Sequence, residues 1–277
     1  MRERHHRKEH AMPVEISTIT ENNLVTYEIP LNESIRICLQ LENLFHQFDK
    51  TAQCTSIHGT KSAMNSLLKM IDVTDRPDLK SKLSQTLTQY TNTFHQFTRS
   101  AQVDAKRLQT TLKELESLNH YLHTNHARIG DMLRQNDFLH QIQSHLANPG
   151  GVCDFRLPAY TLWQNKTASE KAKDLAEWMA AFEPLRNISK LVLQVTRESA
   201  PLETIQALNG FYLQPLNPLT PCQMVRVLLP TQSNLYPEFG AGKHRVTIRF
   251  LKPSYFGAGR STQTQDTVQF QLAVCRI

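Results

Sequence analysis

Apolar residues recur every three or four positions through the first two-thirds of the chain, which is the spacing of amphipathic α-helices. Asn32 and Asp104 precede two of these stripes and are residue types that cap helices. Thr167 and Glu170 have the spacing of a capping box, and Pro184 divides the helical stretch that follows. We expect further helices to begin near Gly59-Thr60, near Pro77 and before Phe138. The stripes comprise residues 35–48, 63–71, 79–97, 108–122, 138–146, 175–182 and 188–195.

The pattern changes after Pro201, where apolar and polar residues alternate and Pro and Gly become frequent. Alternation of this kind is typical of half-buried strands. It predicts strands at 224–229, 246–251 and 268–275, and one strand at 205–213. A β-prone segment at 24–29 stops at Pro30 and could join the same sheet.

These elements predict an α+β protein with a mostly α-helical domain and a smaller antiparallel β-strand domain. Charged and polar residues without periodicity fill the first 22 positions, so we expect a disordered N-terminal extension there. The expected boundaries are 38–148 with the helices of 167–197 for the helical domain, and 198–277 with 23–31 and part of 150–166 for the β domain.

The composition argues against a membrane protein, a secreted protein and a disulfide-rich protein. Hydrophobic residues make up 40% and charged residues 20% of the chain, with a net charge of +6. No apolar run approaches the roughly 20 residues of a membrane span, and no apolar stretch follows the charged start Met1–His10 as in a secretory signal. The five cysteines contain no C-x-x-C pair, so we expect no disulfide framework and no metal site.

We find no sequence signature of catalysis. Gly240-Ala-Gly242-Lys243 resembles part of a phosphate-binding loop, but Pro237 and His244 stand where that loop needs Gly and Ser or Thr. Twelve histidines could serve as general bases, yet none is paired locally with a nucleophile. We therefore expect a protein that is not an enzyme and binds no cofactor.

The most distinctive chemistry is a basic run without acids: Lys243, Arg245, Arg249, Lys252 and Arg260. In a strand over Arg245–Phe250, period two places Val246, Ile248 and Phe250 toward the core, and both arginines on the other face, roughly 13 Å apart. Two guanidiniums so placed can bind carboxylates of an extended acidic peptide. The alternative is a solvated sheet face balanced by nearby acids.

Exposed ion pairs contribute only about 0.2–1 kcal/mol each, so one such site would bind weakly. Two linked sites in a dimer raise the apparent affinity by roughly 10²–10⁴. The basic charge also permits a nucleic-acid-binding protein, although few aromatic residues accompany the basic run and no nucleic-acid-binding motif occurs.

Several short motifs follow one another in an order that resembles the ZapD family of cell-division proteins. The motifs are Pro30-Leu31-Asn32-Glu33, Arg128-Ile129-Gly130, Pro149-Gly150-Gly151, Cys153-Asp154-Phe155-Arg156-Leu157-Pro158, Trp163, Trp178, Pro184-Leu185, Arg197-Glu198-Ser199-Ala200-Pro201, Leu208-Asn209-Gly210-Phe211-Tyr212, Leu235-Tyr236-Pro237 and Arg245-Val246-Thr247-Ile248-Arg249-Phe250. They extend over nearly the whole chain from about Val25.

The resemblance implies a symmetric dimer of helical and β-strand domains that binds the C-terminal tail of the tubulin-like protein FtsZ. Such dimers cross-link and bundle FtsZ filaments in the cytoplasm at the midcell Z-ring, without a membrane or nucleic-acid partner. By motif position, Arg245, Arg249 and Arg76 are implied to bind the tail. We add Lys243 and Arg134 for their charge and for their proximity to matching motifs.

Overall fold

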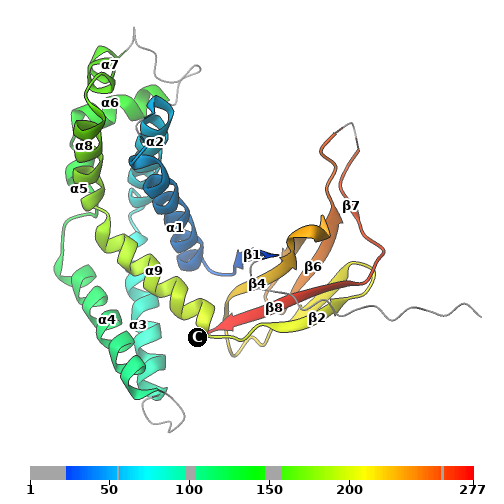
Figure 1. Cartoon of the computed structure of the whole chain (residues 1–277). Helices are drawn as coiled ribbons and strands as arrows, with labels where there is room; N and C mark the ends of the chain where they lie inside the picture. The colour runs from blue at the N-terminus through cyan, green and yellow to red at the C-terminus, as the bar shows by residue number, and fades with distance from the viewer. Residues whose placement is uncertain (1–22, 55, 98–103, 147–156, 257–258) are drawn as a thin grey trace, which may run out of the picture.

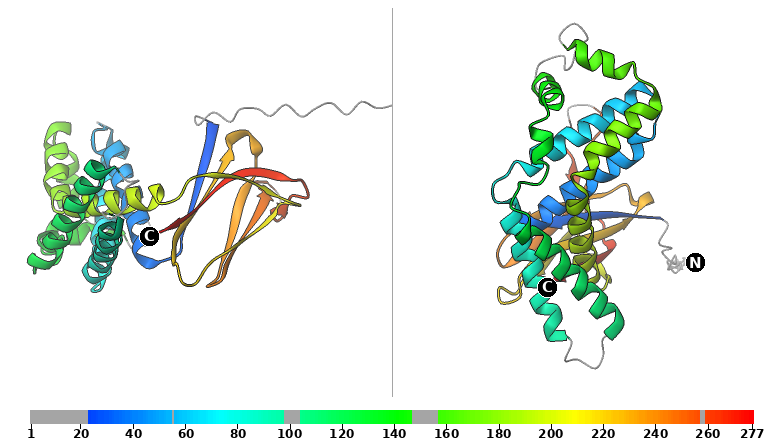
Figure 2. Two further views of the ribbon diagram at one scale, coloured as in Figure 1. Left: turned by 90° about the horizontal axis from the view of Figure 1, so that it is seen from below. Right: turned by 90° about the vertical axis from the view of Figure 1, so that its left-hand side faces the viewer.

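The computed structural model describes residues 23–277 apart from 55, 98–103, 147–156 and 257–258. The expected N-terminal extension therefore lies outside the described residues. Figure 1 shows an elongated helical region with a β module attached to its side, and the C-terminus lies where the two meet. In the left view of Figure 2, the described α-helices lie on one side of this junction and the two sheets lie on the other.

The helical region confirms most of the predicted caps. The Asn32 side chain accepts the Ile35 N–H at 2.8 Å, Asp104 accepts from the first turn of its helix, and Thr167 and Glu170 form the capping box. The described helices are α1 Glu33–Ala52, α2 Ile57–Thr74, α3 Leu79–Phe97, α4 Ala105–Thr124, α5 Asp131–Arg134, α6 Asp137–Leu146, α7 Pro158–Gln164, α8 Ala168–Ala180 and α9 Glu183–Glu198.

Three local details differ from the prediction. Helix α2 begins earlier than Gly59, because Ser56 is its N-cap and its hydroxyl accepts the Gly59 N–H at 3.0 Å. Pro77 precedes α3 instead of lying in its first turn. Pro158–Gln164 forms α7 and packs on α6, so this part of 150–166 is helical, whereas residues 150–156 of the expected β contribution lie outside the described residues.

The strands form two antiparallel sheets. The first has the order β1-β4-β8-β2, and the second has the order β3-β6-β5 with β7 paired to β6. The strands are β1 Leu24–Pro30, β2 Glu203–Ala207, β3 Phe211–Pro215, β4 Cys222–Pro230, β5 Tyr236–Ala241, β6 Arg245–Lys252, β7 Thr262–Gln263 and β8 Val268–Arg276. Strand β1 pairs along its full length with β4, so the N-terminal segment does join the C-terminal sheet.

The prediction of one strand over 205–213 is wrong, because β2 and β3 are separate strands in different sheets. Asn209 and Gly210 lie between them with φ values of 53° and 66°. Such positive φ angles favour glycine and are tolerated by asparagine. A Cβ at Gly210 would lie 2.5 Å from the Thr264 carbonyl oxygen, so the close approach of the two segments also requires glycine.

The two sheets enclose an apolar core of their own. Val246, Ile248 and Phe250 of β6 are fully buried against the first sheet, and the rings of Phe250 and Phe270 lie 4.9 Å apart. A second core fills the helical region and also takes in Met224, Ala273 and Cys275 from β4 and β8. The β module is therefore packed onto the helices through buried side chains.

An ion-pair network, which we call the junction network, crosses the same boundary. Arg197 of α9 donates to Glu28 of β1 at 2.7 and 2.9 Å and to Glu42 of α1 at 2.7 Å. Arg226 of β4 donates at 2.9 Å to Glu28 Oε1, the same oxygen that accepts from Arg197 Nε. Burial alone would raise the pKa of Glu28, but the bonds from Arg197 and Arg226 outweigh it and hold that pKa below its ordinary value.

Candidate functional site

The outer face of the second sheet carries the predicted arginines. Along β6 exposure alternates, with Arg245 and Arg249 exposed and the residues between them buried or half-buried. This confirms that the two guanidiniums share the face that points away from the core. The interval between them is four residues of strand, which is roughly 13 Å.

Apolar side chains lie beside these arginines on the neighbouring strand β3. In the antiparallel register, Phe211 is opposite Arg249 and Leu213 is opposite Thr247. Residues directly opposite each other point to the same face of a sheet. Phe211 and Leu213 are 42% and 39% exposed, so the arginines flank an uncovered apolar surface. We call Phe211, Leu213, Arg245, Thr247 and Arg249 the outer-face patch.

One carboxylate borders the patch. Glu238 of β5 is opposite Arg249 and accepts its guanidinium at 2.5 Å, with both side chains about half exposed. Within the described residues, no ion pair involves Arg245 or Lys243. An acidic ligand would therefore contact Lys243 and Arg245 directly, and would compete with Glu238 for Arg249.

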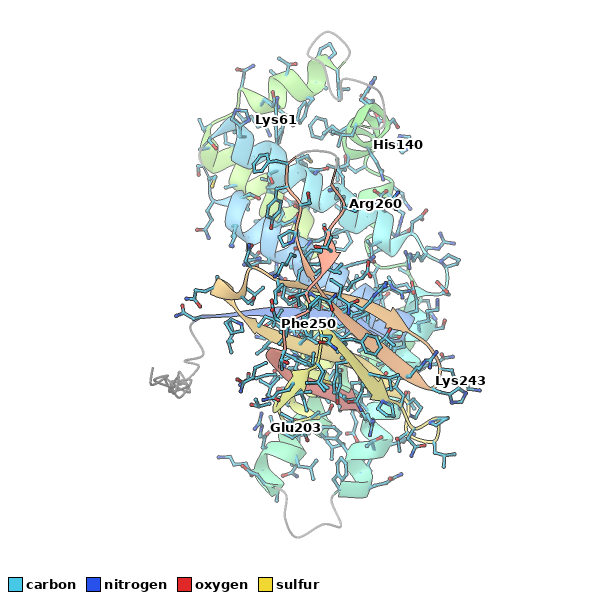
Figure 3. The ribbon with its side chains drawn as sticks, turned by 90° about the vertical axis from the view of Figure 1, so that its right-hand side faces the viewer. Lys61, His140, Glu203, Lys243, Phe250 and Arg260 are labelled. Carbon is cyan, nitrogen blue, oxygen red and sulfur yellow. The ribbon has the colours of Figure 1, made fainter. Side chains whose placement is uncertain are left out.

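Lys243 lies in the turn between β5 and β6, at the rim of a hollow of about 380 Å³. Figure 3 shows Arg260 at the top of the β module and Lys243 at its lower right, well apart from each other. Lys252 lies beyond Arg249 and is bound to Asp266 at 3.2 Å. The basic run is thus divided: Arg245 and Arg249 belong to the outer-face patch, Lys243 lies in the turn next to it, and Lys252 and Arg260 lie farther away.

Arg76 lies in the helical region, where α1 leaves the β module. It donates to Glu33 at 2.6 Å while remaining 42% exposed. Arg36 bonds the same carboxylate. The hydrogen bond from Arg76, with help from Arg36, lowers the pKa of Glu33. Arg76 and Arg36 thus share one carboxylate, and Asp78, whose pKa is lowered by its bond to Lys82 and also by Arg76, is a second acid at this corner.

Arg134 is placed differently, because its side chain is only 16% exposed. It donates to the Thr74 hydroxyl at 3.0 Å and lies 3.4 Å from Asp75. These contacts tie α5 to the loop after α2. The structure therefore gives Arg134 a role in positioning that loop, and it does not bring Arg134 to the outer-face patch.

The described part of the chain gives little support for a metal site, a membrane span or a reactive cysteine. There, no group of three or more His, Cys, Asp or Glu side chains could hold a metal ion, and no helix is long and apolar enough to span a membrane. Burial raises the pKa of Cys38 to about 12 and that of Cys222 to about 11, so both thiols stay protonated at neutral pH.

Comparison of the sequence with known proteins places the chain in a family. The family model for ZapD, described as a cell division protein, matches residues 39–249. The chain belongs to the ZapD family. A cell division protein ZapD of Coxiella burnetii is 46% identical over 91% of this chain and 98% of its own length. A second, from Dechloromonas aromatica, is 34% identical over 92% of this chain and 100% of its own length. Membership of the family supports a role in cell division.

Sequence reasoning missed Phe211 and Leu213 as patch residues. The signal was present, since Asn209-Gly210 is a strong turn pair. Reading Asn209-Gly210 as a backbone turn is incompatible with the single strand predicted over 205–213, and that strand prediction hid the fact that a new strand starts at Phe211 beside the arginines.

Proposed function

We propose that this protein is a non-enzymatic division factor that binds the C-terminal tail of FtsZ and, as a dimer, cross-links and bundles FtsZ filaments at the midcell Z-ring in the cytoplasm. The observation that carries the proposal is the outer-face patch, where arginines flank exposed Phe211 and Leu213. Family membership supports the division role.

The patch suits an acidic peptide that also carries apolar residues. The guanidiniums bind carboxylates in bidentate geometry, and the apolar side chains offer surface worth roughly 25 cal/mol for each Å² buried. Ion pairs at this exposure are weak and screened by salt. A single patch therefore binds its peptide loosely, and two patches in a dimer supply the affinity that bundling needs.

Sedimentation of FtsZ filaments tests the proposal. FtsZ from the same organism, full-length and tail-deleted, is pelleted with and without this protein at two salt concentrations. We expect extra pelleting only with the tail present, and less of it at high salt. If FtsZ without its tail is still pelleted, this protein binds another part of FtsZ, and the patch is not the tail-binding site.

A charge-matched pair of variants locates the site. Arg245→Glu with Arg249→Glu should abolish bundling and leave the fold and the dimer intact, because both side chains face solvent. Lys61→Glu with Lys173→Glu changes the net charge by the same four units at exposed positions on α2 and α8, and should bundle normally. Equal bundling by the two variants would refute the patch assignment. A titration with a fluorescent oligonucleotide at physiological salt tests the nucleic-acid alternative, and we expect no binding of comparable strength.

A further inference from the structure

The hollow beside Lys243 opens at the end of the β sandwich, between its two sheets. Its lining includes Leu31, which follows β1, Cys222 at the start of β4, and Ala241 at the end of β5. Leu216 and Pro218 close it from the segment between β3 and β4. We call this hollow the mouth pocket. Its lining is mainly apolar, with Lys243 as its charged member.

The mouth pocket lies between the two groups of exposed cations. On one side, the Gly242 N–H donates to the Arg245 carbonyl at 2.9 Å, so the pocket borders the arginine strand. On the other side, Leu31 is fixed by its N–H bond to the Gln223 carbonyl at 2.9 Å, two residues before Glu33, which holds Arg76. The pocket is thus linked by short stretches of chain to Arg245 on one side and to the Glu33–Arg76 pair on the other.

We propose that the mouth pocket receives an apolar side chain of the same acidic peptide that binds the outer-face patch. This inference rests on the proposed function and adds to it a specificity site. The peptide it selects carries an apolar residue with carboxylates on both sides, one directed to Arg245 and Lys243 and the other to the corner at Arg76.

Size and charge favour a peptide side chain as the occupant. At about 380 Å³ the pocket is near the lower end of the roughly 300–1,000 Å³ of ligand sites, which suits one or two side chains. Its lining contains no carboxylate. By contrast, the cavity between α3, α4 and α9 is lined by three carboxylates against two arginines, Arg107 and Arg276, so it suits an acidic chain less well.

Position 242 allows the pocket to be filled without straining the backbone. A Cβ at Gly242 would have the Arg245 carbonyl oxygen, 3.7 Å away, as its nearest neighbour, which is an ordinary contact. Gly242 itself lines the pocket, so Gly242→Leu adds a bulky side chain at its wall. Gly242→Ala is the matched control, because one methyl group leaves most of the volume free.

The probe is a fluorescent synthetic peptide with the sequence of the FtsZ C-terminal tail from the same organism, titrated against the full chain by anisotropy. We expect Gly242→Ala to bind within about twofold of wild type. Gly242→Leu should weaken binding by about tenfold or more, the effect of losing one buried aliphatic side chain. Replacing the apolar residue that occupies the pocket with Ala should weaken binding to wild type, but not weaken it further with Gly242→Leu.

Each other outcome overturns the inference. If the double reversal of Arg245 and Arg249 abolishes binding while Gly242→Leu binds as wild type does, the pocket assignment fails and the proposed function stands. If no apolar position of the peptide affects its affinity for wild type, the pocket assignment fails whether or not a variant folds. If Gly242→Leu sediments as a monomer whereas wild type sediments as a dimer, the pocket is occupied by a second copy of the chain and not by the peptide. Absence of peptide binding to wild type would overturn both proposals.

Discussion

Replacing Arg197 tests whether the junction network holds the β module to the helices. Its guanidinium donates to Glu28 and Glu42, and the Glu28 side chain is only 13% exposed. In Arg197→Met, the apolar stem is kept and the charge is lost, so a nearly buried carboxylate loses one of its two partners.

The expected loss follows from burial. Breaking a buried ion pair costs about 3–5 kcal/mol because the remaining charge stays desolvated. Glu28 still keeps Arg226, so we expect the free energy of unfolding to fall by about 2–3 kcal/mol. Arg107→Met is the matched control, since its pair with Glu198 is 65% and 50% exposed. Such a surface pair contributes about 0–1 kcal/mol.

Urea unfolding followed by circular dichroism and by tryptophan fluorescence measures both variants. Trp163 and Trp178 lie together in the helical region, with ring centroids 5.9 Å apart, so fluorescence reports on that region alone. Separation of the two transitions in Arg197→Met would show the β module unfolding independently. A difference between the variants smaller than about 0.5 kcal/mol would refute the reasoning, because the network would then stabilise no more than a surface pair does.

Three further predictions concern single carboxylates and the sandwich core. Glu238→Gln removes the acid that engages Arg249, so the tail peptide should bind a few-fold tighter at low salt; unchanged anisotropy titrations would mean that Arg249 does not meet the peptide. Ile248→Asp buries an unpaired charge at a fully buried position and should destabilise by more than about 4 kcal/mol; a wild-type urea midpoint would contradict the burial. Folding lowers the pKa of Glu28. Its carboxylate therefore stabilises the folded state fully above the ordinary glutamate pKa of about 4.3, and this stabilisation is lost as the pH falls through the lowered pKa of the folded state. Wild type should therefore lose more stability than Glu28→Gln between about pH 5 and 3, and parallel stability curves would argue against the network.

Local signals in the sequence predicted local structure well. Asn32, Asp104 and the Thr167–Glu170 pair cap helices through contacts within three residues, so the capping residues are readable without the fold. The face of β6 was predictable for the same reason, because period two alone separates Arg245 from Val246.

Strand order and long-range partners could not be read in this way. Strand β5 contains Pro237 and Gly240, which interrupt strand patterns, yet it forms because an edge strand tolerates proline. The pairing of Glu28 with Arg197 joins residues 169 positions apart, so only tertiary packing reveals it. The proximity of Phe211 to Arg249 likewise depends on β3 pairing with β6, which no short sequence pattern encodes.

The pairing of β1 with β4 has a consequence for how the chain folds during its synthesis. Asn32, just after β1, bonds Gln223 across 191 residues of sequence. At roughly 5–20 residues per second, a ribosome needs about 10–40 s to make the intervening chain. During that interval the edge of β1 has no partner strand, because all of the described α-helices are synthesised before β4. We therefore expect the β module to form late, and the nascent chain to expose an unpaired strand that chaperones would recognise.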